Sequence, residues 1–151
     1  MATLSVGGND IDFPGILMNC ILDWHFPGSN IEEKSCDEQR TKSWELLNRL
    51  DLVNNIDHLI KKTIDRGRQG SVGDKFNLYV TGFAEFFNDK TDLCNEVTFA
   101  RAANPVPDGK EHTKLTREIR ADFNAMSRKL NAAIQGAVQR NSDKGVKFID
   151  I

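Results

Sequence analysis

The 151-residue chain is 39% hydrophobic and 28% charged, with a formal net charge of −2. This composition is ordinary for a globular domain, and the alternation of basic with acidic residues argues against a nucleic-acid-binding surface. No apolar run approaches the roughly 20 residues of a membrane-spanning helix, and the N-terminus has no signal-peptide pattern. We therefore expect one domain over residues 1–151, with no membrane span and, as written, a cytoplasmic location.

The first thirty residues predict a strand, a turn and a helix. Residues 2–6 form a short apolar run, and Gly7-Gly8-Asn9-Asp10 after it is a strong turn signal. Asp12 offers a helix cap, and Pro14 suits a first helical turn. Helical apolar spacing from residue 16 to residue 24 continues this helix until a Pro- and Gly-containing segment breaks it.

The middle of the chain predicts a long helical region and a second strand. Apolar residues step by three and four from about residue 35 to residue 66, with Asp51 as a possible cap for a restart. A glycine-rich loop follows over residues 66–74. Residues 76–81, which include the β-formers Tyr79, Val80 and Thr81, predict the second strand.

The stretch from residue 83 to residue 110 has no clear period, and we interpret it as an ordered long loop that carries function or covers other residues. Its aromatic residues either wall an acyl pocket or pack beneath the loop; they are Phe83, Phe86 and Phe87. A long amphipathic helix over about residues 112–140 and a third strand over residues 146–151 complete the chain.

This order of elements predicts an α/β fold with a doubly wound, flavodoxin-like arrangement. Strand–helix–strand units normally give parallel neighbours through right-handed crossovers, so we expect about three parallel strands. Parallel sheets are usually covered on both faces. Because a sheet of this size would leave both edges open, we interpret the fold as part of a larger three-layer architecture.

The turn after the first strand is the best candidate site, because ligands of such sheets bind at the carboxyl ends of strands. Gly7 and Gly8 let the backbone turn sharply, and Asn9 presents a neutral donor that suits a developing negative oxygen. One such donor contributes roughly 3–4 kcal/mol to an acyl-transfer transition state. Asp10 would brace the turn. The alternative is an ordinary surface turn, because these residue types are common in loops.

Two segments carry a family resemblance. Thr3-Leu4-Ser5-Val6-Gly7-Gly8-Asn9-Asp10-Ile11-Asp12-Phe13 resembles the Gly-x-Asn-Asp block of the SGNH hydrolases, also called GDSL-type lipases and esterases. Leu78-Tyr79-Val80-Thr81-Gly82-Phe83-Ala84-Glu85-Phe86-Phe87-Asn88 looks like the strand and aromatic loop of secreted fungal and bacterial members. The final helix and strand resemble the segment before that family's last block, so the resemblance spans nearly the whole chain in order.

The resemblance implies a serine-based carboxylic ester hydrolase that needs no metal or organic cofactor. In that family the oxyanion is held partly by the asparagine of this block, so Gly7, Asn9 and, structurally, Asp10 carry over. The nucleophile and base do not. The sequence contains no Gly-Asp-Ser, the Gln69–Gly73 segment misses the Gly-x-Ser-x-Gly pattern, and no histidine has an aspartate three residues before it. Without that pair, double-displacement hydrolysis is expected to be absent from these 151 residues.

The histidines have simpler interpretations than catalysis. His58 is expected on an exposed helix face and His112 in a first helical turn. His25, within Trp24-His25-Phe26-Pro27, is either a loop residue or part of a site rim.

The three cysteines show no metal-ligand spacing, and an odd number suggests either unrelated thiols or a disulfide protein that lacks one partner. The resemblance to secreted members implies that Cys20 pairs with Cys36. It also implies that Cys94 has its partner in a C-terminal block outside this sequence, and that the parent protein is secreted.

Three hypotheses follow. The chain is a partial SGNH-type ester hydrolase, whose full-length parent acts on a small-molecule, lipid or acetylated-glycan ester. Alternatively, it is a non-catalytic remnant that binds a partner or an acyl or glycan ligand, or an unrelated flavodoxin-like domain. The sequence does not identify the ester or the oligomeric state.

Overall fold

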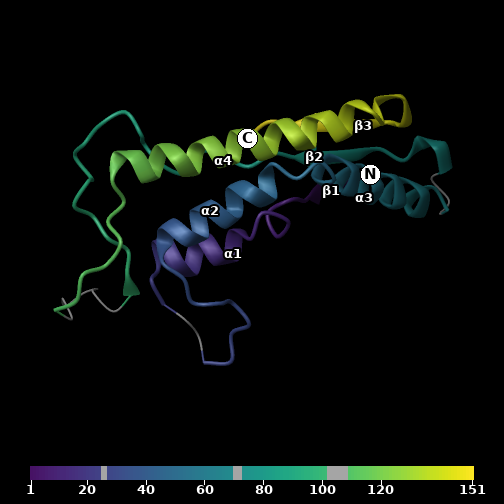
Figure 1. Cartoon of the computed structure of the whole chain (residues 1–151). Helices are drawn as coiled ribbons and strands as arrows, with labels where there is room; N and C mark the ends of the chain where they lie inside the picture. Colours follow the sequence, from purple (N-terminus) through teal and green to yellow (C-terminus); the bar gives the residue numbers. More distant parts are fainter. Residues whose placement is uncertain (25–26, 70–72, 102–108) are drawn as a thin grey trace. The chain divides into compact units, whose positions relative to one another are not determined.

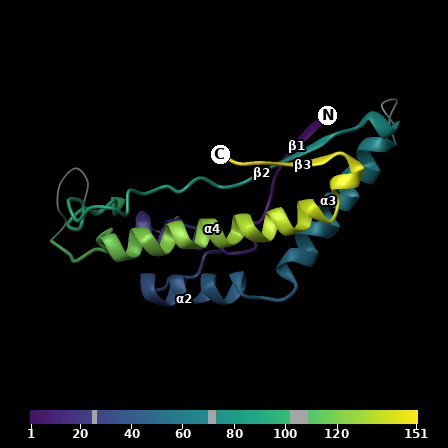
Figure 2. The same ribbon diagram turned by 90° about the horizontal axis from the view of Figure 1, so that it is seen from above.

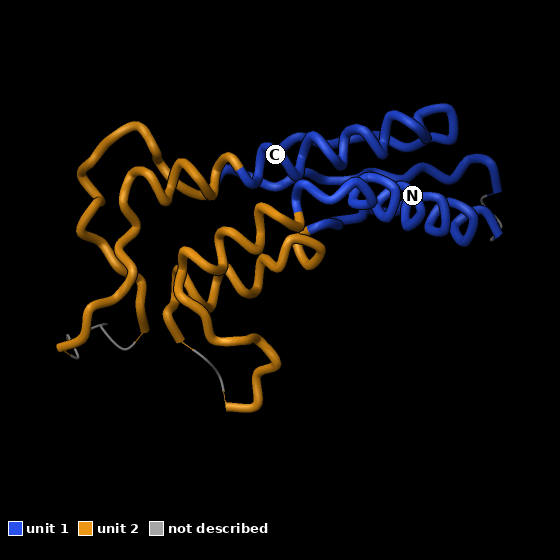
Figure 3. Tube along the Cα trace, in the orientation of Figure 1, with its two compact units in different colours: residues 1–7, 47–85, 126–151 blue, residues 8–46, 86–125 orange. Residues whose placement is uncertain are grey.

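The computed structural model describes residues 1–24, 27–69, 73–101 and 109–151. The chain divides into two compact units, which Figure 3 shows in different colours. Unit 1 contains Met1–Gly7, Leu47–Glu85 and Met126–Ile151. Unit 2 contains Gly8–Leu46 and Phe86–Ala125.

Unit 1 holds a parallel sheet of three short strands, as the sequence predicts (Figure 1). They are β1 (Ala2–Ser5), β2 (Leu78–Thr81) and β3 (Val146–Ile149), in the spatial order β1-β2-β3. The last residues of the three strands, Ser5, Thr81 and Ile149, are in register. All three carboxyl ends therefore meet at the same edge of the sheet.

Helices cover one face of this sheet. Figure 2 shows α3 (Leu52–Arg68) and α4 (Arg117–Gln139) on the same side of the strands. Leu78, Val80 and Val146 are buried against that layer, whereas Thr3 and Lys147 on the opposite face are exposed. Within unit 1 one face of the sheet is thus covered by helices, which agrees with the expected partial flavodoxin-like α/β fold.

A polar link joins the two helices within unit 1. The Nδ2 group of Asn141, directly after α4, donates to Asp57 on α3 at 2.6 Å, and Lys61 donates to the same carboxylate at 2.7 Å. The hydrogen bond from Lys61 lowers the pKa of Asp57, and that from Asn141 adds to the effect. Asp57 is therefore held in its charged form by the native structure.

Unit 2 is built on two helical segments joined by a disulfide. A short helix α1 (Phe13–Ile16) continues directly into the π-helix η1 (Leu17–Ile21), and α2 (Cys36–Leu47) follows after a loop. The disulfide between Cys20 and Cys36 spans 4.6 Å between Cα atoms, which confirms the expected pair. Cys94 is a free, exposed thiol.

Several element boundaries differ from the sequence-based expectation. The region from residue 35 to residue 66 is two helices that break around Asp51, as expected, but Asp51 makes no side-chain cap and pairs with Arg49 instead. Helix α3 extends to Arg68, two residues into the expected loop, and β2 begins at Leu78 rather than at residue 76. Residues 70–72 lie outside the described part of the chain.

Helix α4 begins five residues later than predicted, and His112 lies before it. The start is determined by polar side chains, because Thr116 accepts a hydrogen bond from the amide of Ile119 and Asn95 accepts one from Arg117. These acceptors satisfy amide groups that have no partner within the helix.

The long loop after β2 is ordered over residues 83–101, as expected, because polar side chains of α4 hold its backbone. In unit 1, Asn131 both donates to the carbonyl of Phe83 and accepts from its amide, at 2.9 and 2.8 Å. In unit 2, Asn124 pairs with the backbone of Phe87 in the same way. Residues 102–108 of this loop lie outside the described part of the chain.

Candidate functional site

The exit of β1 requires glycine at position 7. Gly7 is buried and has a φ of 104°, a conformation that side chains with a Cβ rarely adopt. A Cβ placed there would lie 2.7 Å from Cδ1 of Leu130, also in unit 1. Gly7 therefore lets the chain leave the strand tightly against α4.

The next residues form a turn that is held by backbone hydrogen bonds within unit 2. The amide of Asp12 donates to the carbonyl of Asn9 at 3.1 Å, and the amide of Phe13 donates to the carbonyl of Gly8 at 2.9 Å. Asn9 and Asp10 are exposed at the tip of this turn. Among the described residues the carboxamide of Asn9 makes no hydrogen bond, so its N–H groups are available to a ligand.

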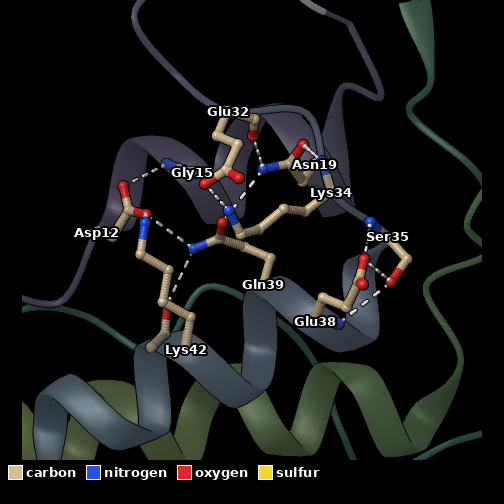
Figure 4. Close-up of polar contacts among 10 residues, drawn as sticks. Asp12, Gly15, Asn19, Glu32, Lys34, Ser35, Glu38, Gln39 and Lys42 are labelled. Atoms are coloured by element: carbon tan, nitrogen blue, oxygen red, sulfur yellow. Dashed lines mark hydrogen bonds and ion pairs between the residues drawn. The ribbon is translucent and has the colours of Figure 1, made fainter.

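The carboxylate that supports this turn in the structure belongs to Asp12 (Figure 4). It accepts from the amide of Gly15 at 3.2 Å, which caps α1 as predicted, and from Gln39 and Lys42 of α2 at 3.1 and 2.7 Å. Burial acts to raise the pKa of Asp12, but the hydrogen bonds from Lys42 and Gln39 outweigh it and lower the pKa overall. The bracing role expected for Asp10 remains a prediction.

Buried polar groups extend this network away from the turn (Figure 4). Asn19 donates to Gln39 at 3.2 Å and to the carbonyl of Glu32 at 3.2 Å, and it accepts from the amide of Lys34. Gln39 and Asn19 are only 1% and 2% exposed. Sequence reasoning did not identify these partners, because they are separated by 13 to 30 residues and belong to no local motif.

The histidines are not brought to the turn by any contact that the structure describes. His58 is an exposed residue of α3, as expected. His112 lies before α4, which begins at Arg117, so the expectation of a first-turn helical residue is wrong. Its Nδ1 atom lies 2.6 Å from the carboxylate of Asp23. His25 and Ser71 lie outside the described residues.

The three phenylalanines of the aromatic loop have different surroundings. Phe87 packs beside Phe123, with 6.0 Å between ring centroids, which fits the packing interpretation. Phe86 is 56% exposed and stacks on Phe13 at 5.9 Å. Phe83 borders a hollow of about 370 Å³ at the carboxyl ends of β2 and β3 in unit 1; its other lining residues are Glu85, Arg128, Asn131, Ala132, Gln135, Asp150 and Ile151.

No group of three or more His, Cys, Asp or Glu side chains among the described residues has an arrangement that could hold a metal ion. Within the same residues, no helix has the length and apolar character needed to span a membrane.

The fold has a counterpart among solved structures. The fold is similar to that of a phospholipase A1 from Streptomyces albidoflavus NA297, with a TM-score of 0.55 and 17% sequence identity. The match covers 97% of this chain and 47% of that one, so the chain spans about half the length of the solved structure. No family model matches the sequence, and no curated protein matches it either. The chain thus has a lipase-like α/β fold.

Proposed function

We propose that these residues form about half of an SGNH-type carboxylic ester hydrolase, in which Asn9 donates a hydrogen bond to the oxyanion of the acyl-transfer intermediate. The observation that carries the proposal is the exposed carboxamide of Asn9, which has no partner of its own on a turn held by backbone hydrogen bonds directly after β1. A neutral donor at such a turn stabilises negative charge that develops on the oxygen in the transition state.

The similarity in fold to a phospholipase A1 supports this proposal. The place of the turn supports it as well, because the exit of β1 is a carboxyl end of a parallel sheet, where such folds bind their ligands. In the longer protein the serine nucleophile and the histidine base come from residues outside the 151. The substrate is a carboxylic ester with a lipid, sugar or small-molecule alcohol. Gly7 allows the tight exit from the strand, and Asp10 lies beside the donor.

The disulfide supports secretion of the longer protein, because such bonds persist in oxidising compartments. The exposed thiol of Cys94 would pair with a cysteine of the missing part. Non-reducing mass spectrometry of the secreted protein tests this pairing.

The genomic sequence on both sides of the coding region tests the proposal. We expect an in-frame Gly-Asp-Ser segment upstream and a histidine-bearing segment downstream. The product of the extended frame should be labelled at serine by a fluorophosphonate and should hydrolyse a short-chain nitrophenyl ester, whereas the 151-residue chain should do neither. Stop codons and unrelated sequence on both sides would contradict the proposal, as would serine labelling of the 151-residue chain.

A further inference from the structure

The orientation of Asn9 depends on the backbone of its own turn. Its carboxamide makes no hydrogen bond among the described residues, so no side-chain contact determines where it points. The backbone contact that reaches Asn9 comes from Asp12, whose amide donates to the carbonyl of Asn9 at 3.1 Å. Any group that fixes Asp12 therefore also restricts Asn9.

Asp12 occupies a backbone conformation that needs support. Its φ and ψ of 56° and 45° lie in the left-handed region, which residues with a side chain adopt uncommonly. Such a conformation persists where the surroundings hold it. Both carboxylate oxygens of Asp12 are occupied, Oδ1 by the amide of Gly15 and Oδ2 by Gln39 and Lys42.

Gln39 and Lys42, the side chains that bind the carboxylate of Asp12, both belong to helix α2. Gln39 is 1% exposed, and it also accepts from Asn19 and donates to Ser43. The disulfide at Cys36 ties the first residue of α2 to η1. Position 15 must remain glycine for this contact, because a Cβ there would lie 2.7 Å from both Asp12 and Gln39.

From this geometry we infer that Asp12 is a positioning residue: its anchorage to Lys42 and Gln39 of α2 holds the backbone of the turn that carries Asn9 in one conformation. The consequence for ester hydrolysis rests on the proposed function, but the anchorage itself does not. Protonation of Asp12 would remove the charge that Lys42 binds, so the backbone of the turn loosens at acid pH.

Nuclear magnetic resonance of the isotope-labelled 151-residue chain tests this inference without measuring activity. We expect the HN–Hα couplings of Asn9 and Asp12 to show one backbone conformation in the wild type and averaged values in Lys42→Met. Lys61→Met is the matched control, because Lys61 also pairs with an aspartate at 2.7 Å and is similarly exposed, 46% against 41%. That control should leave Asn9 unchanged.

An acid titration gives a second readout. In the Asp10→Asn background, which removes the carboxylate next to Asn9, the Asn9 amide signal should shift on acidification with a midpoint below the ordinary aspartate pKa of 3.8. This shift should vanish when Asp12→Asn is added. If Asp12→Asn does not fold, Lys42→Met decides alone. Averaged couplings in the wild type, unchanged couplings in Lys42→Met, or a titration that survives in the Asp10→Asn, Asp12→Asn double variant would overturn the inference. None of these results depends on whether Asn9 acts on an ester, so the two proposals fail separately.

Discussion

Position 7 illustrates how one residue limits the path of the chain out of β1. The positive φ and the contact with Leu130 are independent reasons for glycine, one local and one tertiary. A turn with a larger residue there would have to move away from the end of the strand.

We predict that Gly7→Ala lowers the free energy of unfolding by about 2–3 kcal/mol, the sum of a strained backbone and an overpacked contact. Gly28→Ala is the matched control, because Gly28 has a φ of 83° but nothing within 4 Å of its added Cβ. That control should lose only about 1 kcal/mol. Urea denaturation of both variants measures the difference, and equal losses would show that Leu130 gives way.

The residues of the candidate turn differ in how far sequence predicts them. Gly7 and Asn9 belong to a contiguous motif, so the position of the turn follows from neighbouring residues. Asp12 and Pro14 give a local capping signal, so the capping role of Asp12 follows in the same way. The partners of Asp12 do not, since Gln39 and Lys42 lie 27 and 30 residues away on another helix. Long-range polar contacts leave no periodic trace in a single sequence.

At the scale of elements, hydrophobic periodicity predicts the helices and strands well and their ends poorly. The three strands, their parallel pairing and the break near Asp51 agree with the pattern. The start of α4 does not, because it depends on Asn95, which lies 22 residues before the amide it accepts from.

The disulfide is expected to stabilise unit 2 by closing the loop between η1 and α2. Its cysteines are 16 residues apart, and a loop of this size corresponds to about 3 kcal/mol. We predict that the double variant Cys20→Ser, Cys36→Ser loses about this amount in thermal or denaturant unfolding. Cys94→Ser, which alters the exposed thiol, should change stability by less than about 0.5 kcal/mol; a comparable loss in both variants would contradict the assignment.

At the scale of the whole molecule, acid should destabilise the chain. The pKa values of Asp12, Asp57 and Asp89 are all lowered by hydrogen bonds or charges in the native structure. The unfolded chain therefore binds more protons at acid pH. The free energy of unfolding is then fully retained above about pH 5 and falls as the pH drops through the ordinary aspartate range toward the lowered native values.

Denaturant unfolding at a series of pH values measures this dependence. Asp57→Asn should lower the stability at neutral pH and give a shallower decline on acidification, because it removes one of the carboxylates that the native state holds charged. A free energy of unfolding that increases as the pH is lowered from about 5 to about 3 would be inconsistent with these lowered pKa values.

The molecule as a whole has a lipase-like fold and spans about half the length of the solved structure it resembles. The oxyanion role of its first turn is a proposal. The chemistry we propose therefore has to be measured in the product of the extended reading frame.

The most direct test is the turnover number of that longer protein on a nitrophenyl ester, with Asn9→Ala compared with Asn48→Ala, an exposed asparagine after α2. We predict that Asn9→Ala lowers kcat by roughly 10²–10³-fold with little change in KM, because the donor acts mainly in the transition state. Asn48→Ala should retain full turnover. A kcat for Asn9→Ala equal to that of Asn48→Ala would contradict the assignment of Asn9 as the oxyanion donor.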